Sequence, residues 1–226
     1  MSDLRARARE LARDAIARGD ATGWFEQLYV ELERDGLAIS WVDLAPNPYL
    51  VEWLDRQPSP PGGRALVVGC GYGDDAELLA DRGLEVAAFD IAPSAVARCR
   101  SRFPGSRVQY LVADALRPPA DWVAAFDFVF EAYTIQVLQG EARAACARSI
   151  GSLAAPGGRL LVVARSRMED GPEGAMPWPL TRREIEAFGK FDALHEPGLD
   201  MVSLTELVEP GDPPVPRFVA EFVARG

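Results

Sequence analysis

Short runs of consecutive apolar residues alternate with stretches of helical periodicity along most of the chain. Runs typical of buried strands lie at 65–69, 85–90, 107–112, 126–131 and 159–165. Helical patterns separate them, over about 75–82 (ended by Gly83), from Pro93 onward, and over about 140–154 (ended by Pro156-Gly157-Gly158). Strands alternating with helices of this length are typical of βαβ units and therefore indicate a parallel sheet.

The C-terminal part of the chain departs from this alternation. A loop rich in Gly and Pro (170–179) precedes a short helix predicted at 181–188, and two β-like stretches follow at about 199–208 and 217–224. Because no helix separates these two stretches, they should pair antiparallel at one edge of the sheet. We therefore predict an α/β fold with a doubly wound, mostly parallel seven-stranded sheet and an antiparallel edge strand.

The N-terminal segment is predicted to form a helical cap. Its apolar positions fall at helical spacing: Leu4, Ala8, Leu11, Ala15 and Ile16. The Pro- and Gly-rich run 58–63 indicates a joint, so we expect a cap over 1–62 and the main domain over 63–226. The first residues lack an apolar signal-peptide core, and no apolar run approaches the roughly 20 residues that span a bilayer. We expect a cytoplasmic protein without a membrane partner.

Charge and cysteine content narrow the class of ligand. The chain has 226 residues, 24 of them basic and 34 acidic, which gives a formal net charge of −10. Nucleic acid binding needs a basic face, so a small-molecule partner is favoured over nucleic acid. The three cysteines (Cys70, Cys99 and Cys146) are odd in number and none has metal-site spacing, which fits a reducing compartment and predicts no metal. The sequence carries no indication of oligomeric state.

A glycine-rich turn follows the first predicted strand. In VVGCGYGDD, Gly69, Gly71 and Gly73 lie where that strand leads into a helix, the position at which open α/β sheets bind ligands. A dinucleotide fingerprint requires G-x-G-x-x-G, whereas here Asp74 occupies the place of the third glycine. Acidic residues at this turn suit a ligand with an amino group and one carboxylate better than one with two phosphates.

Two further acids end the next two strands. Asp90 closes the second strand, where a carboxylate can accept hydrogen bonds from both hydroxyls of a ribose. Asp114 follows the third strand, where an adenine amine could be recognised. The combination of a glycine-rich turn and these two acids points to a ligand with an adenosine part.

With these pieces in place, residues 63–165 resemble the class I S-adenosylmethionine-dependent methyltransferases. The similar pieces are VVGCGYG, AAFDIAPSAV, YLVADAL, FDFVFEAYTI and LAAPGGRLLVV. The resemblance implies S-adenosyl-L-methionine as cofactor and a methyl-transfer face formed after the fourth strand, with Tyr133 as the candidate catalytic residue. It implies these cofactor-binding positions: Trp24, Gly69, Cys70, Gly71, Gly73, Asp75, Asp90, Ile91, Asp114, Ala115, Glu131 and Ala132.

The flanking segments resemble the thiopurine and thiol S-methyltransferase group. The carrying segments are WFEQLYVELERDGLAISWVDLAPNPYL and GPEGAMPWPLTRREIEAF. This resemblance implies that Trp24 packs near the cofactor, that the segment 176–179 roofs the acceptor pocket, and that Trp41, Asp43, Tyr133 and Trp178 contact the acceptor. Trp24, Trp41 and Trp53 could equally be hydrophobic anchors.

The sequence offers no convincing general base. His195 is the only histidine, Asp43 fits a capping role as well as a contact role, and a tyrosine with a pKa near 10 is a poor base. A thiol, with a pKa of about 8.5, needs little assistance, so we predict methyl transfer to a small thiol. The alternatives are an O- or N-methyltransferase of a small metabolite, a nicotinamide-dependent oxidoreductase, and a non-enzymatic cofactor sensor.

Overall fold

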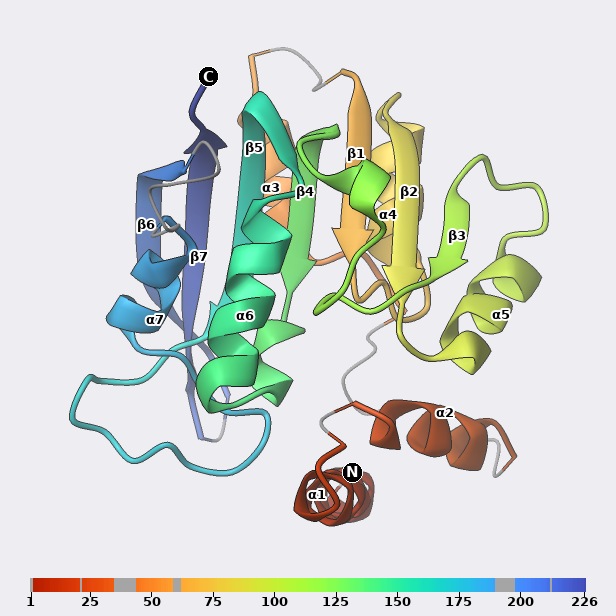
Figure 1. Cartoon of the computed structure of the whole chain (residues 1–226), viewed down its shortest axis with the longest axis vertical. Helices are drawn as coiled ribbons and strands as arrows, with labels where there is room; N and C mark the ends of the chain where they lie inside the picture. The colour runs from red at the N-terminus through yellow and green to blue at the C-terminus, as the bar shows by residue number, and fades with distance from the viewer. Residues whose placement is uncertain (1, 21, 35–43, 59–61, 190–197, 212) are drawn as a thin grey trace.

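A seven-stranded sheet runs through the molecule, with helices on both faces (Figure 1). The computed structural model describes residues 2–20, 22–34, 44–58, 62–189, 198–211 and 213–226. The strands are β1 (Arg64–Val68), β2 (Glu85–Asp90), β3 (Gln109–Val112), β4 (Phe126–Ala132), β5 (Ala154–Arg165), β6 (Leu199–Glu209) and β7 (Val215–Ala224).

The order of the strands is β3-β2-β1-β4-β5-β7-β6. The first five pair in parallel, whereas β7 pairs antiparallel with both β5 and β6. The predicted doubly wound, mostly parallel sheet is therefore confirmed, as is the antiparallel pairing of the last two strands. The antiparallel strand β7 lies one place inside the edge, and β6 forms the edge itself.

The helices are α1 (Ser2–Ala17), α2 (Trp24–Arg34), α3 (Pro48–Asp55), α4 (Asp74–Asp81), α5 (Pro93–Arg102), α6 (Gly140–Gly151) and α7 (Arg182–Glu186). Single 3₁₀ turns, η1 (Ala120–Trp122), η2 (Ile135–Val137) and η3 (Ala187–Gly189), lie between longer elements. Alternate side chains of β1 enter two hydrophobic clusters: Val67 packs with α3, α4 and α5, and Leu66 packs with α6 and α7. This alternation explains why each central strand is apolar throughout.

Two element boundaries differ from the sequence prediction. The helix expected over about 140–154 ends at Gly151, because Ala154 already pairs with Phe126 of β4 and the chain is committed to β5 from that residue. The strand expected at 107–112 begins at Gln109, where pairing with Ala87 of β2 starts.

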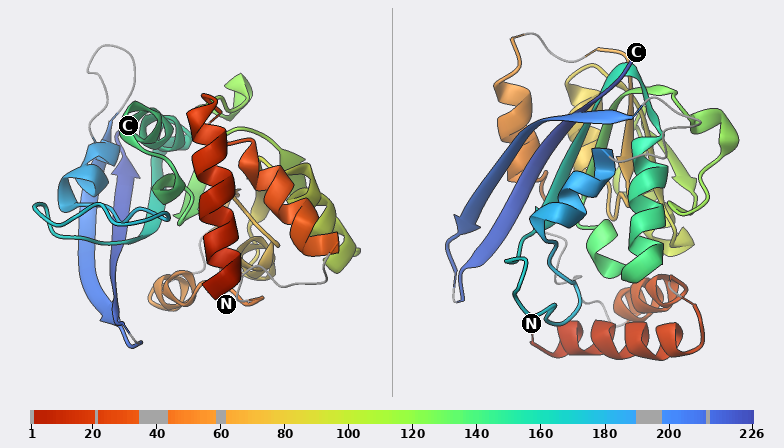
Figure 2. Two further views of the ribbon diagram at one scale, coloured as in Figure 1. Left: turned by 90° about the horizontal axis from the view of Figure 1, so that it is seen from below. Right: turned by 60° about the vertical axis from the view of Figure 1, so that its left-hand side comes forward.

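Helices α1 and α2 lie across the carboxyl ends of the parallel strands (Figures 1 and 2). Leu11 of α1 and Trp24 and Leu28 of α2 form an apolar cluster together with Ala95 of α5 and Met176. Helix α3 instead shares the core of the sheet, where Trp53 stacks on Phe128 at 4.7 Å between ring centroids. The division at residues 62 and 63 stays a prediction. Among the described helices, none has the length and apolar character needed to cross a membrane.

Candidate functional site

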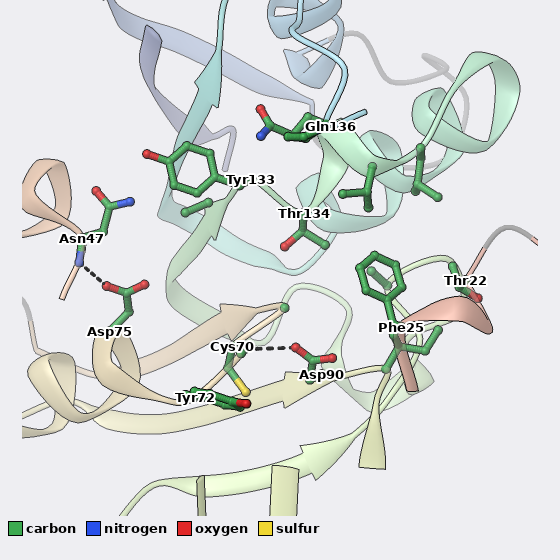
Figure 3. A pocket seen from close by; sticks show the side chains of 18 of the residues that line it. Thr22, Phe25, Asn47, Cys70, Tyr72, Asp75, Asp90, Tyr133, Thr134 and Gln136 are labelled. Carbon is green, nitrogen blue, oxygen red and sulfur yellow. Dashed lines mark hydrogen bonds between the residues drawn. The ribbon is translucent and has the colours of Figure 1, made fainter. Parts of the chain in front are cut away.

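A cavity of about 490 Å³ opens between the cap helices and the carboxyl ends of the central strands (Figure 3). This volume falls within the range of small-molecule sites. One end is bounded by the turn after β1 and the ends of β2 and β3, and the other by Asn47, Tyr133, Arg165, Glu209 and Arg217. We call the first the glycine-turn end and the second the β5–β7 end.

The glycine turn has a backbone that other residues would not tolerate. Gly69, Gly71 and Gly73 all have positive φ, at +61°, +53° and +92°. A Cβ on Gly69 would lie 2.2 Å from Oγ1 of Thr134, and one on Gly73 would lie 2.5 Å from the hydroxyl of Tyr110. The turn is therefore a cradle that requires glycine and brings bare backbone against the cavity, as the sequence predicted.

Asp90 links this turn to the end of β2. Its two carboxylate oxygens accept hydrogen bonds from the backbone N–H groups of Gly71 and Ala92, each at 3.0 Å. The side chain lines the cavity although the residue is only 6% exposed. Burial raises the pKa of Asp90 to about 6, and the backbone N–H donors oppose this shift. The remaining lone pairs of a carboxylate held in this way suit vicinal hydroxyl groups.

A largely apolar compartment adjoins Asp90. It is lined by Ile91, Ala113, Asp114, Ala115, Leu116 and Leu138. Oδ1 of Asp114 accepts the backbone N–H of Leu116 at 2.9 Å, so this carboxylate shapes the turn that carries Ala115. Asp114 and Ala115 thus lie on the same cavity wall as Asp90, and Cys70 borders the cavity beside them.

Asp75 lines the wall between the two ends of the cavity. It lies in the first turn of α4, and its Oδ1 accepts the backbone N–H of Asn47 at 2.6 Å (Figure 3). Burial raises the pKa of Asp75 to about 6. The structure therefore offers an acceptor of hydrogen bonds next to the glycine turn.

Glu131 does not line the cavity, in contrast to the sequence prediction for it. Glu131 is fully buried (0% exposed), and its Oε1 accepts hydrogen bonds from the backbone N–H groups of Thr134 at 2.7 Å and Ile135 at 3.0 Å. The next two residues, Ala132 and Tyr133, do line the cavity. Tyr133 has φ +66°, a conformation that this backbone bracing holds in place. Glu131 therefore fixes the turn that carries Tyr133, through hydrogen bonds to the two residues that follow it.

The β5–β7 end contains a polar group that the sequence analysis missed. The guanidinium of Arg217 lies over the ring of Tyr133 at 4.8 Å, and its Nη2 donates to Oε2 of Glu209 at 2.5 Å. The hydroxyl of Tyr49 donates to Oε1 of Glu209 at 2.7 Å. Because the register between β5 and β7 cannot be read from the sequence, only the position of Arg165 at a strand end could have signalled this group.

Helices α1 and α2, which we call the cap, and the loop that carries Met176 and Pro177 cover the cavity. Trp24 lines it, is 2% exposed and stacks on Phe25 at 3.8 Å. Nε of Arg9 donates to the backbone carbonyl of Met176 at 2.8 Å, which joins α1 to the loop. Met176 and Pro177 line the cavity. Trp178 does not, in contrast to the prediction that it contacts the acceptor: it packs against the apolar cluster of α1 and α2, and its backbone N–H donates to the carbonyl of Gln136 at 2.7 Å.

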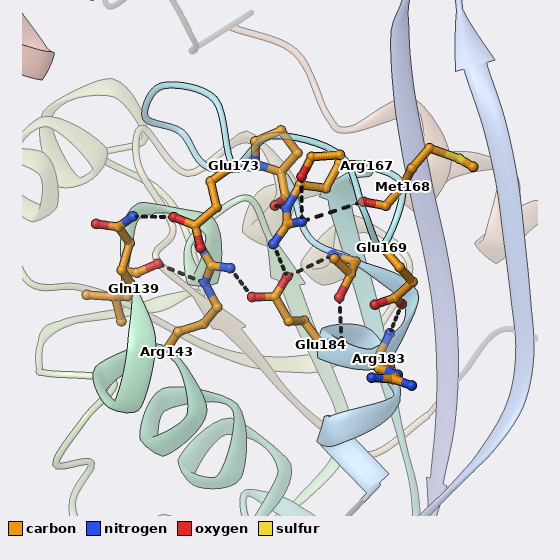
Figure 4. A network of polar contacts seen from close by, with 12 residues as sticks. Gln139, Arg143, Arg167, Met168, Glu169, Glu173, Arg183 and Glu184 are labelled. Atoms are coloured by element: carbon orange, nitrogen blue, oxygen red, sulfur yellow. Dashed lines mark hydrogen bonds and ion pairs between the residues drawn. The ribbon is translucent and has the colours of Figure 1, made fainter.

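A network of charged residues from α6, α7 and the end of β5 supports that loop (Figure 4). Buried Arg143 of α6 pairs with Glu184 of α7, and its Nε donates to the carbonyl of Leu138 at 2.8 Å. Nε of Arg167 donates to the carbonyl of Pro179 at 3.1 Å. These contacts fix both ends of the loop that carries Met176 and Pro177 to the cavity.

Some candidate residues lie outside the described part of the chain. These are Trp41, Asp43 and His195. Within the described ranges, no group of three or more His, Cys, Asp or Glu side chains is arranged to hold a metal ion.

Comparisons with known proteins agree with this geometry. Residues 65–158 match the model of a family described as a methyltransferase domain. The ubiquinone biosynthesis O-methyltransferase of Xanthomonas axonopodis pv. citri is 34% identical over 123 residues, 54% of this chain and 51% of that protein. The thiocyanate methyltransferase 1 of Arabidopsis thaliana is 30% identical over 125 residues, 54% of this chain and 55% of that protein. The chain thus spans about half the length of these curated relatives.

Solved structures show the same fold. The N-methyltransferase NodS of Bradyrhizobium japonicum WM9, in complex with S-adenosyl-L-homocysteine, aligns with a TM-score of 0.66 at 19% identity, over 88% of this chain and 98% of that one. A 1,6-didemethyltoxoflavin-N1-methyltransferase of Burkholderia thailandensis aligns with a TM-score of 0.66 at 17% identity, over 89% and 88%. The fold is the Rossmann-like methyltransferase fold, and the match to the methyltransferase-domain family covers residues 65–158.

Proposed function

We propose that this protein transfers a methyl group from S-adenosylmethionine to a small molecule, with a thiol as the preferred acceptor. The observation that carries the proposal is the continuous cavity, which joins the glycine turn of the methyltransferase domain to a separate polar end at β5–β7. The glycine cradle and the buried carboxylate of Asp90 fit the cofactor.

Each part of the cofactor has residues suited to it. Backbone of the glycine turn and the carboxylate of Asp75 would hold the methionine part, because the carboxylate of Asp75 can accept hydrogen bonds from an ammonium group. Asp90 would hold the ribose, and the compartment around Ile91, Asp114 and Ala115 the adenine. Trp24 would cover the cofactor from the cap.

The bound cofactor supplies an activated methyl group, and the protein chain supplies position and shelter. Tyr133 and Ala132 would form the wall beside the methyl group, with Met176 and Pro177 as the roof. Holding the acceptor atom in line with the methyl carbon and excluding water can contribute roughly 7–11 kcal/mol to the lowering of the barrier.

The preference for a thiol rests on the protonation of the groups at the β5–β7 end. Burial raises the pKa of Tyr133, which makes this phenol a poor base. Burial also raises the pKa of Glu209, but hydrogen bonds from Arg217 and Tyr49 outweigh it and lower that pKa below its usual value. Because neither Tyr133 nor Glu209 is a good general base, the site suits an acceptor that ionises near neutral pH without assistance. A thiol is such an acceptor.

An oxygen or nitrogen acceptor is the second candidate, and Asp75 favours it. A carboxylate with a pKa of about 6 at the cavity wall could take a proton from a hydroxyl if it were not engaged with the cofactor's amino group. The relatives do not separate the two, since one is named for O-methylation and another for thiocyanate, a sulfur nucleophile.

The first test is calorimetric titration with S-adenosylmethionine, S-adenosylhomocysteine and, as a control, NADH. We expect micromolar affinity for the first two and none for NADH; absence of binding to both would refute the proposal. Mass spectrometry of reactions with matched thiols and phenols then identifies the acceptor atom. Faster methylation of the thiols supports the thiol assignment, and faster methylation of the phenols replaces it with the second candidate.

A further inference from the structure

A buried glutamine side chain borders the cavity beside its β5–β7 end. Gln136 lies in the 3₁₀ turn η2 after β4, and it lines the cavity although it is only 2% exposed. In Figure 3 its side chain is seen at the same wall of the cavity as Tyr133. A primary amide has an oxygen that accepts hydrogen bonds and a nitrogen that donates them. When such a group is buried, both halves are expected to have partners.

The oxygen of this amide has its partner within the protein. Oε1 of Gln136 accepts the backbone N–H of Arg165, at the end of β5, at 2.9 Å. Because a backbone N–H can only donate, this contact also determines which amide atom is oxygen and which is nitrogen. The main chain of Gln136 is held as well, since its carbonyl accepts the N–H of Trp178 at 2.7 Å. The orientation of the amide is therefore set before a ligand binds, which lowers the entropy cost of binding.

The nitrogen of the amide is open to the cavity. Within the described ranges, no acceptor forms a hydrogen bond with Nε2, and Nε2 is not among the enclosed side-chain atoms that lack a partner, such as Oε2 of Glu131. Since the rest of Gln136 is buried, the accessible part of Nε2 faces the cavity that the residue lines. The donor half of a fixed, buried amide is thus presented to whatever occupies this part of the cavity.

The strand order places this donor beside the body of the acceptor. The proposed cofactor contacts from the sheet follow β1, β2 and β3, and the wall beside the methyl group, Ala132 and Tyr133, lies at the end of β4. Gln136 is tied to the end of β5, which is the neighbour of β4 on the side away from β1. We therefore expect its amide to contact a part of the acceptor that lies beyond the atom receiving the methyl group.

We propose that Gln136 is a specificity-determining residue, and that the methyl acceptor carries a carbonyl oxygen that receives a hydrogen bond from Nε2. This inference rests on the proposed function and adds one chemical group to the description of the acceptor. A carbonyl oxygen is the ordinary neutral partner of an amide N–H, and an acceptor without such an oxygen would leave a buried donor unpaired. The structural alternative is that Gln136 only joins η2 to β5 and to the roof; its replacement would then affect all acceptors alike.

The test compares ring-substituted benzyl thiols and benzyl alcohols on the protein saturated with S-adenosylhomocysteine. Each compound carries an acetyl group or, as its match, an isopropenyl group. The two groups share a planar shape, but only the acetyl group has an oxygen that accepts a hydrogen bond. The methylene group between ring and nucleophile keeps the acidity of the two members of a pair similar, and the 3- and 4-isomers offer the carbonyl oxygen at two positions.

Calorimetric titration gives the ratio of affinities for each ketone and its matched alkene. We expect at least one ketone to bind about ten-fold or more tightly than its alkene, because the alkene leaves the N–H of Nε2 without a partner. Equal binding within every pair, or no saturable binding of any ketone, would overturn the inference.

Two variants of Gln136 separate recognition from structural support. Gln136→Leu removes both halves of the amide, whereas Gln136→Glu keeps an oxygen for the N–H of Arg165 and replaces the donor by an acceptor. At pH 8 the ketone-to-alkene ratio should fall to one or below in both variants. Gln139→Leu is the matched control, because Gln139 lies three residues later and donates its Nε2 to Glu173 at 3.1 Å but does not line the cavity. This control should keep the ratio of the wild type.

A ratio that stays at the wild-type value in both Gln136 variants would overturn the inference, even if ketone and alkene lose affinity equally. Affinity for S-adenosylhomocysteine is measured separately. Its absence in the wild type would overturn the proposed function, whereas equal binding of ketone and alkene to the loaded protein overturns this inference alone.

Discussion

At the scale of single residues, the side chain of Asp90 serves the fold and the site at once. Its carboxylate joins the glycine turn to the end of β2 through two backbone N–H groups and still borders the cavity. Such a residue cannot be replaced without consequence for both roles. The same holds for Glu131, which braces the turn under Tyr133 without reaching the cavity.

Replacement of Asp90 by Asn should weaken cofactor binding. If Asp90 holds the ribose as proposed, loss of its charge should cost about 1–3 kcal/mol in affinity for S-adenosylhomocysteine, measured by calorimetry. Asp127→Asn is the control, because Asp127 also accepts a backbone N–H, that of Arg64 at 2.8 Å, but lies at the opposite end of the sheet. Equal effects of the two variants would show that Asp90 acts only on folding.

Tyr133→Phe should affect turnover more than cofactor binding. The ring would still support the guanidinium of Arg217, while the hydroxyl that faces the acceptor end would be lost. We expect a several-fold drop in kcat with an unchanged Kd for S-adenosylhomocysteine. A change in that Kd with normal turnover would instead place Tyr133 in the cofactor site.

Glu131 should make the free energy of unfolding depend on pH. Burial raises its pKa from 4.5 to about 7 in the folded chain, so the folded state holds the proton more tightly than the unfolded state. The stability from this difference is fully present below about pH 4.5 and is lost as the pH rises through about 7, on the order of 3 kcal/mol.

Glu131→Gln removes this titration and retains an oxygen acceptor for Thr134 and Ile135. Relative to the wild type, the variant should gain stability between about pH 5 and pH 8 in urea denaturation. Asp75 and Asp90 titrate in both proteins and cancel in the comparison. A difference that does not vary with pH would contradict the assignment.

At the scale of elements, the sequence predicts those parts of the site that follow strand ends. The glycine turn, Asp90 and Asp114 were found because the carboxyl ends of neighbouring parallel strands meet at one edge. The prediction that Glu131 lines the site differs from the structure because side chains alternate along β4. Glu131 lies on the same side of the sheet as Val129, facing α6, whereas Phe130 and Ala132 pack on the other side. Arg217 and Glu209 were missed because the antiparallel register of β7 is set by tertiary pairing.

The loop that roofs the cavity should depend on α6 and α7. Arg143→Met would remove a buried partner of Glu184 and a donor to the carbonyl of Leu138, with an expected loss of about 1–3 kcal/mol in stability and a raised KM for the acceptor. Arg148→Met on the same helix breaks only an exposed pair with Glu141 and should cost less than about 1 kcal/mol. Thermal denaturation and steady-state kinetics of both variants check this; equal losses would argue against support of the roof by Arg143.

At the scale of the whole molecule, the cap and the sheet meet through the cavity. Helix α2 is joined to α5 by Glu26, which accepts the N–H and hydroxyl of Ser94 at 3.1 and 2.8 Å, and α1 is joined to α2 by Arg7 and Glu31 at 2.9 Å. Since Trp24 forms part of the cavity wall, bound cofactor would add contacts between cap and sheet. A ligand that contacts both the cap and the sheet must stabilise the packing of one on the other.

Hydrogen exchange should therefore slow in the cap when S-adenosylhomocysteine binds. We expect protection of amides in α1 and α2 and in the glycine turn, but little change in the edge strand β6 before Glu209, whose side chains are mostly exposed and lie away from the cavity. Trp24→Ala should reduce the protection of the cap and raise the dissociation rate of the ligand. Phe128→Leu, a change in the core beneath α3, is the control and should alter neither. Protection confined to the glycine turn would mean that the cap packs on the domain without taking part in cofactor binding.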